Sequence, residues 1–383
     1  MRIRRRTDGF LAAHGDEFIR YSVEGGKLRA TGSARAGLDI QYAWPHPTRA
    51  LAYLAISNGG PGERGSDHAL AVCHLGIDGP AFEPEPVRLA ARPLHLSLDR
   101  DARHLLVAYN DPSGITVHRL APDGRIGEEM AQPDDIAWGT FGHQVLVTPA
   151  GGAVLFPCRG HDARDGHPEQ PGVLQVFGYD DGRLAPRARI APGGGYGFGP
   201  RHLDFHPVLP WMFLGLERQN EILVFRTAGD TVEPEPVFRI STVADAGEGR
   251  QALAALHVHP DGRRLSVSNR CYGSAASPAG PVMAAGENSI ATFAIDPDTG
   301  HLEAVSRAPT GGYLPRTFSI DPDGDLLIAA NSEAARARTP GGDAIDVAPG
   351  LVMFRAEPDG TLREIDRSTV GASGKRLFWA GFL

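Results

Sequence analysis

The sequence predicts an all-β chain folded as a seven-bladed β-propeller with four antiparallel strands per blade. Short apolar runs recur along the chain, tight turns separate them, and 48 Gly and 31 Pro fall between them, as expected when many short strands are joined by turns. No segment predicts a helix of useful length and no linker divides the chain. We therefore expect one domain over residues 1–383.

The repeat begins with an inner hairpin: an apolar strand, a turn near Pro or Asp-Gly, and a second strand that ends in a polar residue. Its turn positions lie 49 to 62 residues apart, at Pro47, Arg100, Pro149, Pro207, Pro260 and Pro322. This period is slightly longer than a usual four-stranded blade. A second, amphipathic hairpin follows each inner one, as in EILVFRTAGDTVEP (221–234), and its alternation fits half-buried outer strands.

The two ends of the chain complete the count. With FIRYSVEGGKLRA (18–30) included, seven outer hairpins stand against six complete inner hairpins. GFLAAHG (9–15) and RLFWAGFL (376–383) can supply the missing inner pair. We expect N- and C-terminal strands to close the ring, because closure leaves no open sheet edge.

Composition limits the possible partners. A net charge of −8 disfavours nucleic acid, and no apolar run is long enough for a membrane span. The three cysteines are far apart, and no apolar segment follows the basic start, so we expect a cytoplasmic protein without disulfides or a signal peptide. Its partner is expected to be a small molecule, and the oligomeric state is left open.

Propeller geometry predicts which polar residues share a face, because an inner strand leaves one face and the next strand returns to it. Six residues before the turn positions stand Gln41, Leu94, His143, Arg201, Ala254 and Arg316. Ten residues after them stand Ser57, Asn110, Arg159, Glu217, Arg270 and Ser332. These two registers gather four Arg, one His and one Glu at one channel mouth. Guanidiniums there can bind an anion or an oxyanion, and a His or Glu can move a proton.

The chain resembles the lactonase family of seven-bladed propellers, which includes propeller-type 6-phosphogluconolactonases and 3-carboxy-cis,cis-muconate cycloisomerases. The segments that carry the resemblance are GPRHLDFHP (199–207), LHVHPDGRRLSVSNR (256–270), NSIATFAIDPDTGHLEAV (288–305) and PTGGYLPRTFSIDPDGDLLIAANSE (309–333). The resemblance implies catalytic roles for His143, Arg201, Glu217 and Arg270. We expect substrate binding by Arg159, Arg316, His202 and Asn110. Insertions at 157–171, 271–287 and 333–349 are expected to overhang the mouth and set substrate choice.

The expected activity is hydrolysis of a small acidic or sugar-derived lactone without metal or cofactor. Arg201 and Arg270 are expected to bind the anionic group and the carbonyl oxygen, and His143 or Glu217 to transfer the proton. Two alternatives stay open: a cycloisomerase of the same family, and a non-catalytic propeller that binds a protein at its mouth.

Two clusters could ligate a metal but have simpler explanations. The loop with His161, Asp162, Asp165 and His167 is typical of solvated loop residues. The second cluster lies at the ends of the returning strands and consists of Asn58, Asn110, Glu217, Asn269 and Asn331. Asn at such positions caps strand ends, and the resemblance is to a metal-free class, so we expect no metal.

Overall fold

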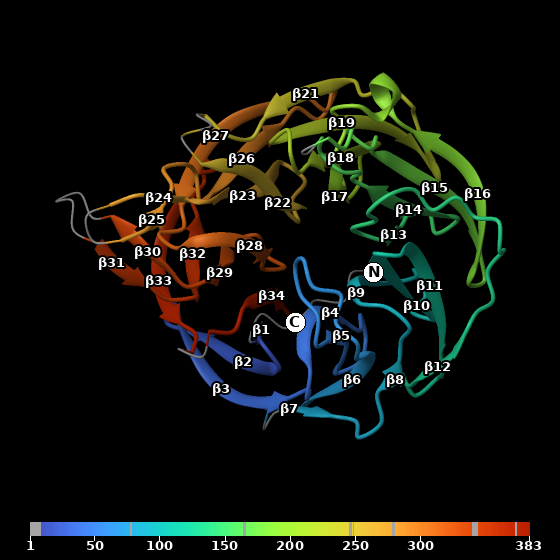
Figure 1. The fold of residues 1–383 in the computed structure, drawn as a ribbon, viewed down its shortest axis with the longest axis horizontal. Helices are drawn as coiled ribbons and strands as arrows, with labels where there is room; N and C mark the ends of the chain where they lie inside the picture. Colours follow the sequence, from blue (N-terminus) through green and yellow to red (C-terminus); the bar gives the residue numbers. More distant parts are fainter. Residues whose placement is uncertain are drawn as a thin grey trace.

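A computed structural model of the chain places seven antiparallel sheets around a central axis, and a path of four strands runs through each sheet (Figure 1). The structure describes residues 9–76, 79–163, 166–244, 247, 249–277, 280–338, 344–371 and 374–383. The predicted seven-bladed β-propeller is confirmed.

The first three blades follow the chain from its N-terminal strand. The first contains β1 (Phe10–His14), β2 (Glu17–Glu24), β3 (Lys27–Arg35) and β34 (Leu377–Phe382). The second contains β4 (Asp39–Pro45), β5 (Leu51–Ser57), β6 (His68–Gly76), β7 (Gly79–Phe82) and β8 (Val87–Arg88). The third contains β9 (Pro93–Leu98), β10 (His104–Asn110), β11 (Ser113–Leu120) and β12 (Ile126–Glu129).

Four further blades complete the ring. The fourth contains β13 (Leu146–Val147), β14 (Ala153–Cys158), β15 (Val173–Asp180) and β16 (Arg183–Ile190), and a 3-10 turn (Pro192–Gly195) follows it. The fifth contains β17 (Pro200–Phe205), β18 (Trp211–Leu216), β19 (Glu221–Ala228), β20 (Thr231–Val232) and β21 (Phe238–Ser241). The sixth contains β22 (Arg250–Val258), β23 (Arg264–Tyr272), β26 (Ser289–Ile295) and β27 (Leu302–Pro309). The seventh contains β28 (Tyr313–Ile320), β29 (Leu326–Glu333), β32 (Gly350–Ala356) and β33 (Leu362–Thr369).

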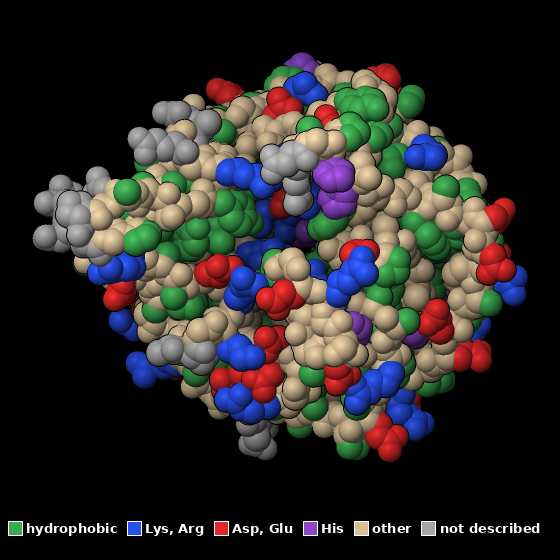
Figure 2. All heavy atoms as spheres, viewed as in Figure 1, with side chains coloured by type: hydrophobic (Ala, Val, Ile, Leu, Met, Phe, Trp, Pro, Cys, Tyr) green, Lys and Arg blue, Asp and Glu red, His purple; other side chains and the backbone are tan. Residues whose placement is uncertain are grey.

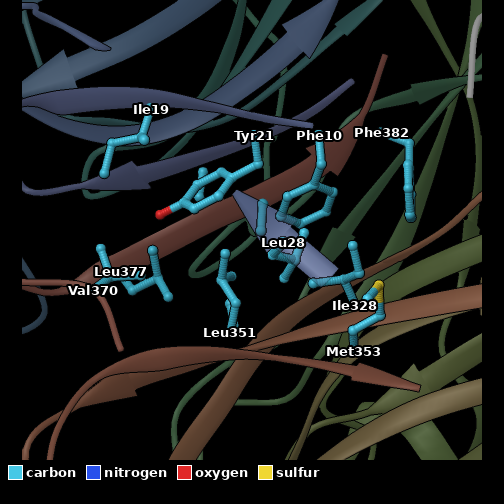
Figure 3. Packing of buried hydrophobic residues seen from close by; sticks show 13 residues of the cluster. Phe10, Ile19, Tyr21, Leu28, Ile328, Leu351, Met353, Val370, Leu377 and Phe382 are labelled. Atoms are coloured by element: carbon cyan, nitrogen blue, oxygen red, sulfur yellow. The ribbon is translucent and has the colours of Figure 1, made fainter. Parts of the chain in front are cut away.

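The terminal strands close the ring as predicted. β34 pairs antiparallel with β1, from Phe10 opposite Phe382 to His14 opposite Leu377. The rings of Phe10 and Phe382 meet edge to face with their centroids 5.1 Å apart. Around them, apolar side chains of the first blade pack against Ile328, Leu351 and Met353 of the seventh (Figure 3). Strands from both ends of the chain therefore share one core with the neighbouring blade.

A β-bulge interrupts six of the seven inner strands near one end of the channel. In five of them, the pairing with the second strand skips one residue of the inner strand. In β22, two residues stand opposite a single residue of β23. The bulged residues are Gln41, Leu94, Arg201, Ala254 with Ala255, Arg316 and Phe378. A bulge bends the strand and re-aims its side chain. This ring of bulges brings side chains of different blades to the same level of the axis.

Hydrophobic clusters fill the spaces between neighbouring blades and hold the inner strands in place. Over the described part of the chain, no helix has the length and apolar character needed to cross a membrane.

Candidate active site

A pocket of about 370 Å³ opens where the inner strands begin. Figure 2 shows it as a hollow at the centre of one face, with basic side chains gathered around it. Its lining includes His143, which precedes β13, and Arg316 at the bulge of β28. Arg159, Glu217 and Arg270 reach it from the ends of second strands. The two predicted registers therefore meet on one face.

Glu217 is the centre of the site. Its Oε1 accepts a 2.7 Å hydrogen bond from Nη2 of Arg270, and Nε of Arg201 lies 3.4 Å from the same oxygen. Nη1 of Arg159 donates to Oε2. Three guanidiniums from three blades thus share one carboxylate, whose residue is only 7% exposed.

Each of these arginines has a second anchor that fixes its direction. Arg270 donates to the carbonyl of Leu253 at 3.0 Å and to the hydroxyl of Tyr272. Arg159 lies over the ring of Phe141, 3.9 Å from its centroid. Arg201 donates to the carbonyl of Ala254 and is 1% exposed. Because several contacts hold each guanidinium in one orientation, it can stabilise a developing negative charge without first moving.

Charge in the cluster keeps Glu217 ionised. Burial alone would raise the pKa of Glu217, but Arg159, Arg201 and Arg270 hold it well below its ordinary value. Because the carboxyl group stays ionised at neutral pH, it cannot act as a proton donor there. Since the same carboxylate is occupied by three cations, it is also a poor base.

Three histidines continue the site into the channel. The rings of His143 and His202 meet at 5.1 Å, and His95 lies 5.9 Å from His202. Burial lowers the pKa of His143 well below 6.5, and the nearby charge of Arg201 lowers it further. The imidazole is therefore neutral at pH 7 and has a free lone pair. Of the three, only His143 lines the pocket.

Comparison with known proteins identifies the family. Residues 17–339 match the sequence model of the family described as Lactonase, 7-bladed beta-propeller. The chain belongs to this family.

Named relatives agree with this assignment, and a solved structure shares the fold. A 6-phosphogluconolactonase of Bacillus subtilis is 27% identical over 68% of the chain and 66% of its own length. Another from Pectobacterium carotovorum is 26% identical over 64% of the chain and 66% of its own length. A periplasmic gluconolactonase of Pseudomonas aeruginosa has the same fold, with a TM-score of 0.67 and 20% identity over 96% of the chain and 97% of its own.

The eight predicted site residues divide into two groups in this lactonase-family propeller. Six line the pocket: Asn110, His143, Arg159, Glu217, Arg270 and Arg316. Arg201 and His202 lie beneath it, where they contact Glu217 and His143 respectively. Arg201 is thus placed to position Glu217, whereas Arg159 has the pocket-facing place that was expected of Arg201.

Several lining residues were not predicted. Arg92, Phe141 and Tyr272 belong to the pocket wall, as does the segment 60–64 between β5 and β6. Arg92 stands two residues before Leu94, and Tyr272 two residues after Arg270. Because side chains two apart in a strand share a face, extending each register by two residues would have found both. Segment 60–64 has no such signal, since an ion pair of 2.8 Å between Arg64 and Asp111 holds it at the mouth.

The predicted insertions contribute less to the pocket than expected. Those at 271–287 and 333–349 contain two ribbons, β24 (Ser274–Ala275) with β25 (Val282–Met283) and β30 (Ala335–Arg338) with β31 (Ala344–Val347). They extend from the side of the ring (Figure 1). Of the described residues in the three insertions, only Arg159 and Tyr272 line the pocket.

Several of the possible metal ligands have other partners. Asp162 pairs with Arg218 at 2.8 Å and with Arg250 at 2.9 Å, while Asp165 of the same cluster lies outside the described residues. Oδ1 of Asn58 accepts hydrogen bonds from the amides of Ser66 and Asp67, as a loop cap does, and Nδ2 of Asn269 donates to the carbonyl of Thr242. Among the described side chains, no group of three or more His, Cys, Asp or Glu is arranged to hold a metal ion.

Proposed function

We propose that this propeller hydrolyses a small acidic or sugar-derived lactone with its own side chains and without a metal. One observation carries the proposal: a neutral imidazole, His143, shares a single pocket with the anchored guanidiniums of Arg159 and Arg270. The first is a proton acceptor and the second an oxyanion site. The relatives named 6-phosphogluconolactonase support a lactone as the substrate.

The reaction needs two proton transfers, and His143 can perform both. It takes a proton from water as the oxygen attacks the lactone carbonyl carbon, and Arg159 and Arg270 stabilise the oxyanion. The carbon–oxygen bond of the ring then breaks, and the imidazolium gives its proton to the leaving alkoxide. The new carboxylic acid ionises, so each turnover releases one proton. Burial and Arg201 disfavour the imidazolium, so the first proton transfer is uphill and the return of the proton to the alkoxide is downhill.

Glu217 and Arg201 are positioning residues in this scheme. Glu217 stays ionised and orients Arg159 and Arg270 from below. Arg201 is buried beside Glu217, and its Nε lies 3.4 Å from Oε1, the oxygen that also accepts from Arg270. Neither needs to touch the substrate.

Initial rates on a panel of sugar and muconate lactones test the proposal. His143→Asn is expected to lower kcat by about 10²–10⁴-fold, and Arg270→Gln to lower kcat by about 10²–10³-fold. His74→Asn is the matched control, since His74 pairs with Glu83 on an outer, exposed part of β6. Full activity of folded His143→Asn rejects the assignment.

Product analysis in ¹⁸O-labelled water separates hydrolysis from isomerisation. Hydrolysis places one labelled oxygen in the product carboxylate, whereas a cycloisomerase adds none. Failure to turn over any lactone on the panel favours a binding role for the mouth.

We also propose that the protein acts in the cytoplasm. All three cysteines, Cys73, Cys158 and Cys271, are free and buried, which suits a reducing compartment. Cell fractionation tests this, and recovery from the periplasm rejects it.

A further inference from the structure

Two arginines at the mouth differ from the three that share Glu217. Arg92 and Arg316 both line the pocket, and Arg92 is only 8% exposed. Within the described ranges, no ion pair joins either guanidinium to a carboxylate. An arginine this deep usually has a carboxylate partner, because an unpaired buried charge is costly.

Neutral groups hold both side chains instead. Nη1 of Arg92 donates a 2.7 Å hydrogen bond to Oε1 of Gln41. The amide of Gln41 is itself fixed, since its Nε2 donates to the carbonyls of Asp39 at 3.0 Å and Gly59 at 3.3 Å. The guanidinium of Arg316 lies over the ring of Phe378, 5.0 Å from its centroid. Gln41 and Phe378 are both bulge residues. They orient the two cations without neutralising them.

The neighbouring positive charges make this arrangement unfavourable. Burial lowers the pKa of Arg92 to about 10, and Arg316 and Arg376 contribute to the same shift. Burial likewise lowers the pKa of Arg316, with Arg270 acting in the same direction. Arg376 has its own partner, Glu333, at 2.8 Å. Glu217 partly offsets this shift for Arg316. Arg92 and Arg316 nevertheless repel each other across the pocket, because within the described ranges no carboxylate forms an ion pair with either guanidinium.

We propose that Arg92 and Arg316 form an anion subsite for a dianionic group of the substrate, of the phosphate monoester type, distinct from the Glu217 cluster. This deepens the proposed function and rests on it for the identity of the substrate. Two unpaired cations match two negative charges, and a phosphate offers enough oxygens for both guanidiniums. The lactone ring then lies toward Arg159, Arg270 and His143, and its charged substituent lies toward Arg92 and Arg316.

Binding of inorganic phosphate to the full-length protein tests the subsite without any turnover. We expect calorimetry to show at least a tenfold weaker affinity in Arg92→Gln and Arg316→Gln. Arg35→Gln is the matched control, because it removes the same charge from a guanidinium that lies outside the pocket lining and is already paired with Asp16. Its affinity is expected to stay within threefold of wild type. Equal losses in all three variants, or no loss at Arg92 and Arg316, overturn the proposal.

Thermal unfolding distinguishes a binding role from a structural one. Without phosphate, Arg92→Gln and Arg316→Gln are expected to melt at or above the wild-type temperature, since each removes a repulsion. With phosphate, wild type gains stability by mass action and the two variants gain little. Variants that melt well below wild type and still bind phosphate normally contradict the subsite.

Kinetics then connect the subsite to the substrate. For a phosphorylated sugar lactone, both variants are expected to raise KM at least tenfold, whereas KM for the unphosphorylated lactone stays within twofold. Equal effects on the two lactones overturn the assignment.

If no lactone is hydrolysed but phosphate binding still depends on Arg92 and Arg316, the subsite stands and the proposed hydrolysis fails. If a glutamine variant does not fold, a phosphate-soaked wild-type crystal decides, because phosphate bound away from both arginines rejects the subsite.

Discussion

Nη2 of Arg270 lies 2.7 Å from Oε1 of Glu217, although the two residues belong to different blades. Each stands ten residues after the turn of its own inner hairpin, so the pair joins equivalent positions of neighbouring repeats. The backbone repeats the link, since the amide of Leu253 donates to the carbonyl of Glu217 at 3.0 Å. One carboxylate therefore couples the geometry of the site to the packing of the blades.

Replacing Glu217 by Gln is expected to destabilise the fold. The change leaves Arg159, Arg201 and Arg270 without their shared anion, and breaking a buried ion pair in this way costs about 3–5 kcal/mol. Urea titration measures the loss in free energy of unfolding. Glu221→Gln is the control, because Glu221 faces Arg239 at 3.4 Å near the surface and is expected to change stability by about 1 kcal/mol or less. A Glu217→Gln protein as stable as the control contradicts this account.

Stability is expected to fall as the pH drops below about 6.5. Burial lowers the pKa of His95 to about 3 and that of His257 to about 4. Because these values lie below that of a histidine in the unfolded chain, the unfolded state binds more protons between about pH 6.5 and 4, and acid favours it. Melting temperatures measured across this range are expected to show the slope. His257→Asn makes it shallower, and an unchanged slope in that variant contradicts the prediction.

Asp204 is expected to act in the opposite direction. Burial raises its pKa to about 6, so between about pH 4 and 6 the folded state holds a proton that the unfolded chain releases. This opposes the acid loss caused by the histidines. Asp204→Asn removes the opposition, and the melting temperature then falls more steeply with acid than in wild type. If the melting temperature of Asp204→Asn falls less steeply with acid than that of wild type, the prediction is wrong.

Phe10→Ala is expected to weaken ring closure. Phe10 is fully buried and contacts Phe382 across the pairing of β1 with β34. Removing a buried aromatic ring costs about 3–5 kcal/mol, which chemical denaturation can measure. Val208→Ala, at a site that is 83% exposed, is expected to change stability by less than about 0.5 kcal/mol. Equal effects of the two substitutions rule out a closing role for this contact.

Asp162→Asn is expected to release the segment that follows Arg159. Asp162 joins this segment to Arg218 and Arg250, and the ring of its neighbour His161 meets that of Phe141 edge to face with the centroids 5.2 Å apart. Faster limited proteolysis within residues 157–171 and a higher KM, with kcat near wild type, are the expected results. Asp123→Asn, which breaks an exposed pair with Arg125, is the control. Unchanged proteolysis in Asp162→Asn shows that other contacts hold the segment.

Most of the fold could be predicted from the sequence because turn residues mark each repeat. Pro149, Pro207, Pro260 and Pro322 mark the ends of inner strands, and counting from them reached His143, Glu217, Arg270 and Arg316. The terminal closure also followed from counting, since one inner pair was missing. Both predictions depend on residue spacing, because a strand advances by a nearly constant distance per residue.

Side-chain direction was not available from spacing alone. Arg201 and Arg316 occupy the same place in the count and both are bulge residues, yet the first lies beneath Glu217 and the second lines the pocket. Leu94 is also a bulge residue and lines the pocket, but it is apolar, so its residue type gave no indication of a site. The place of segment 60–64 depends on a tertiary ion pair between Arg64 and Asp111, which leaves no local pattern. Arg92 was missed because the counted register stopped at Leu94, two residues after it.

At the bulges, the side chain at the mouth can change without affecting the strand pairing that holds the blade together. A skipped residue has no opposite partner in the ladder, so replacing its side chain leaves strand pairing intact. Gln41, Leu94, Ala254 and Phe378 are such positions without a charge. Leu94 lines the pocket itself, while Gln41 and Phe378 orient Arg92 and Arg316. A change at one of these three positions can therefore alter the ligand that the mouth accepts while the strand pairing beneath stays the same.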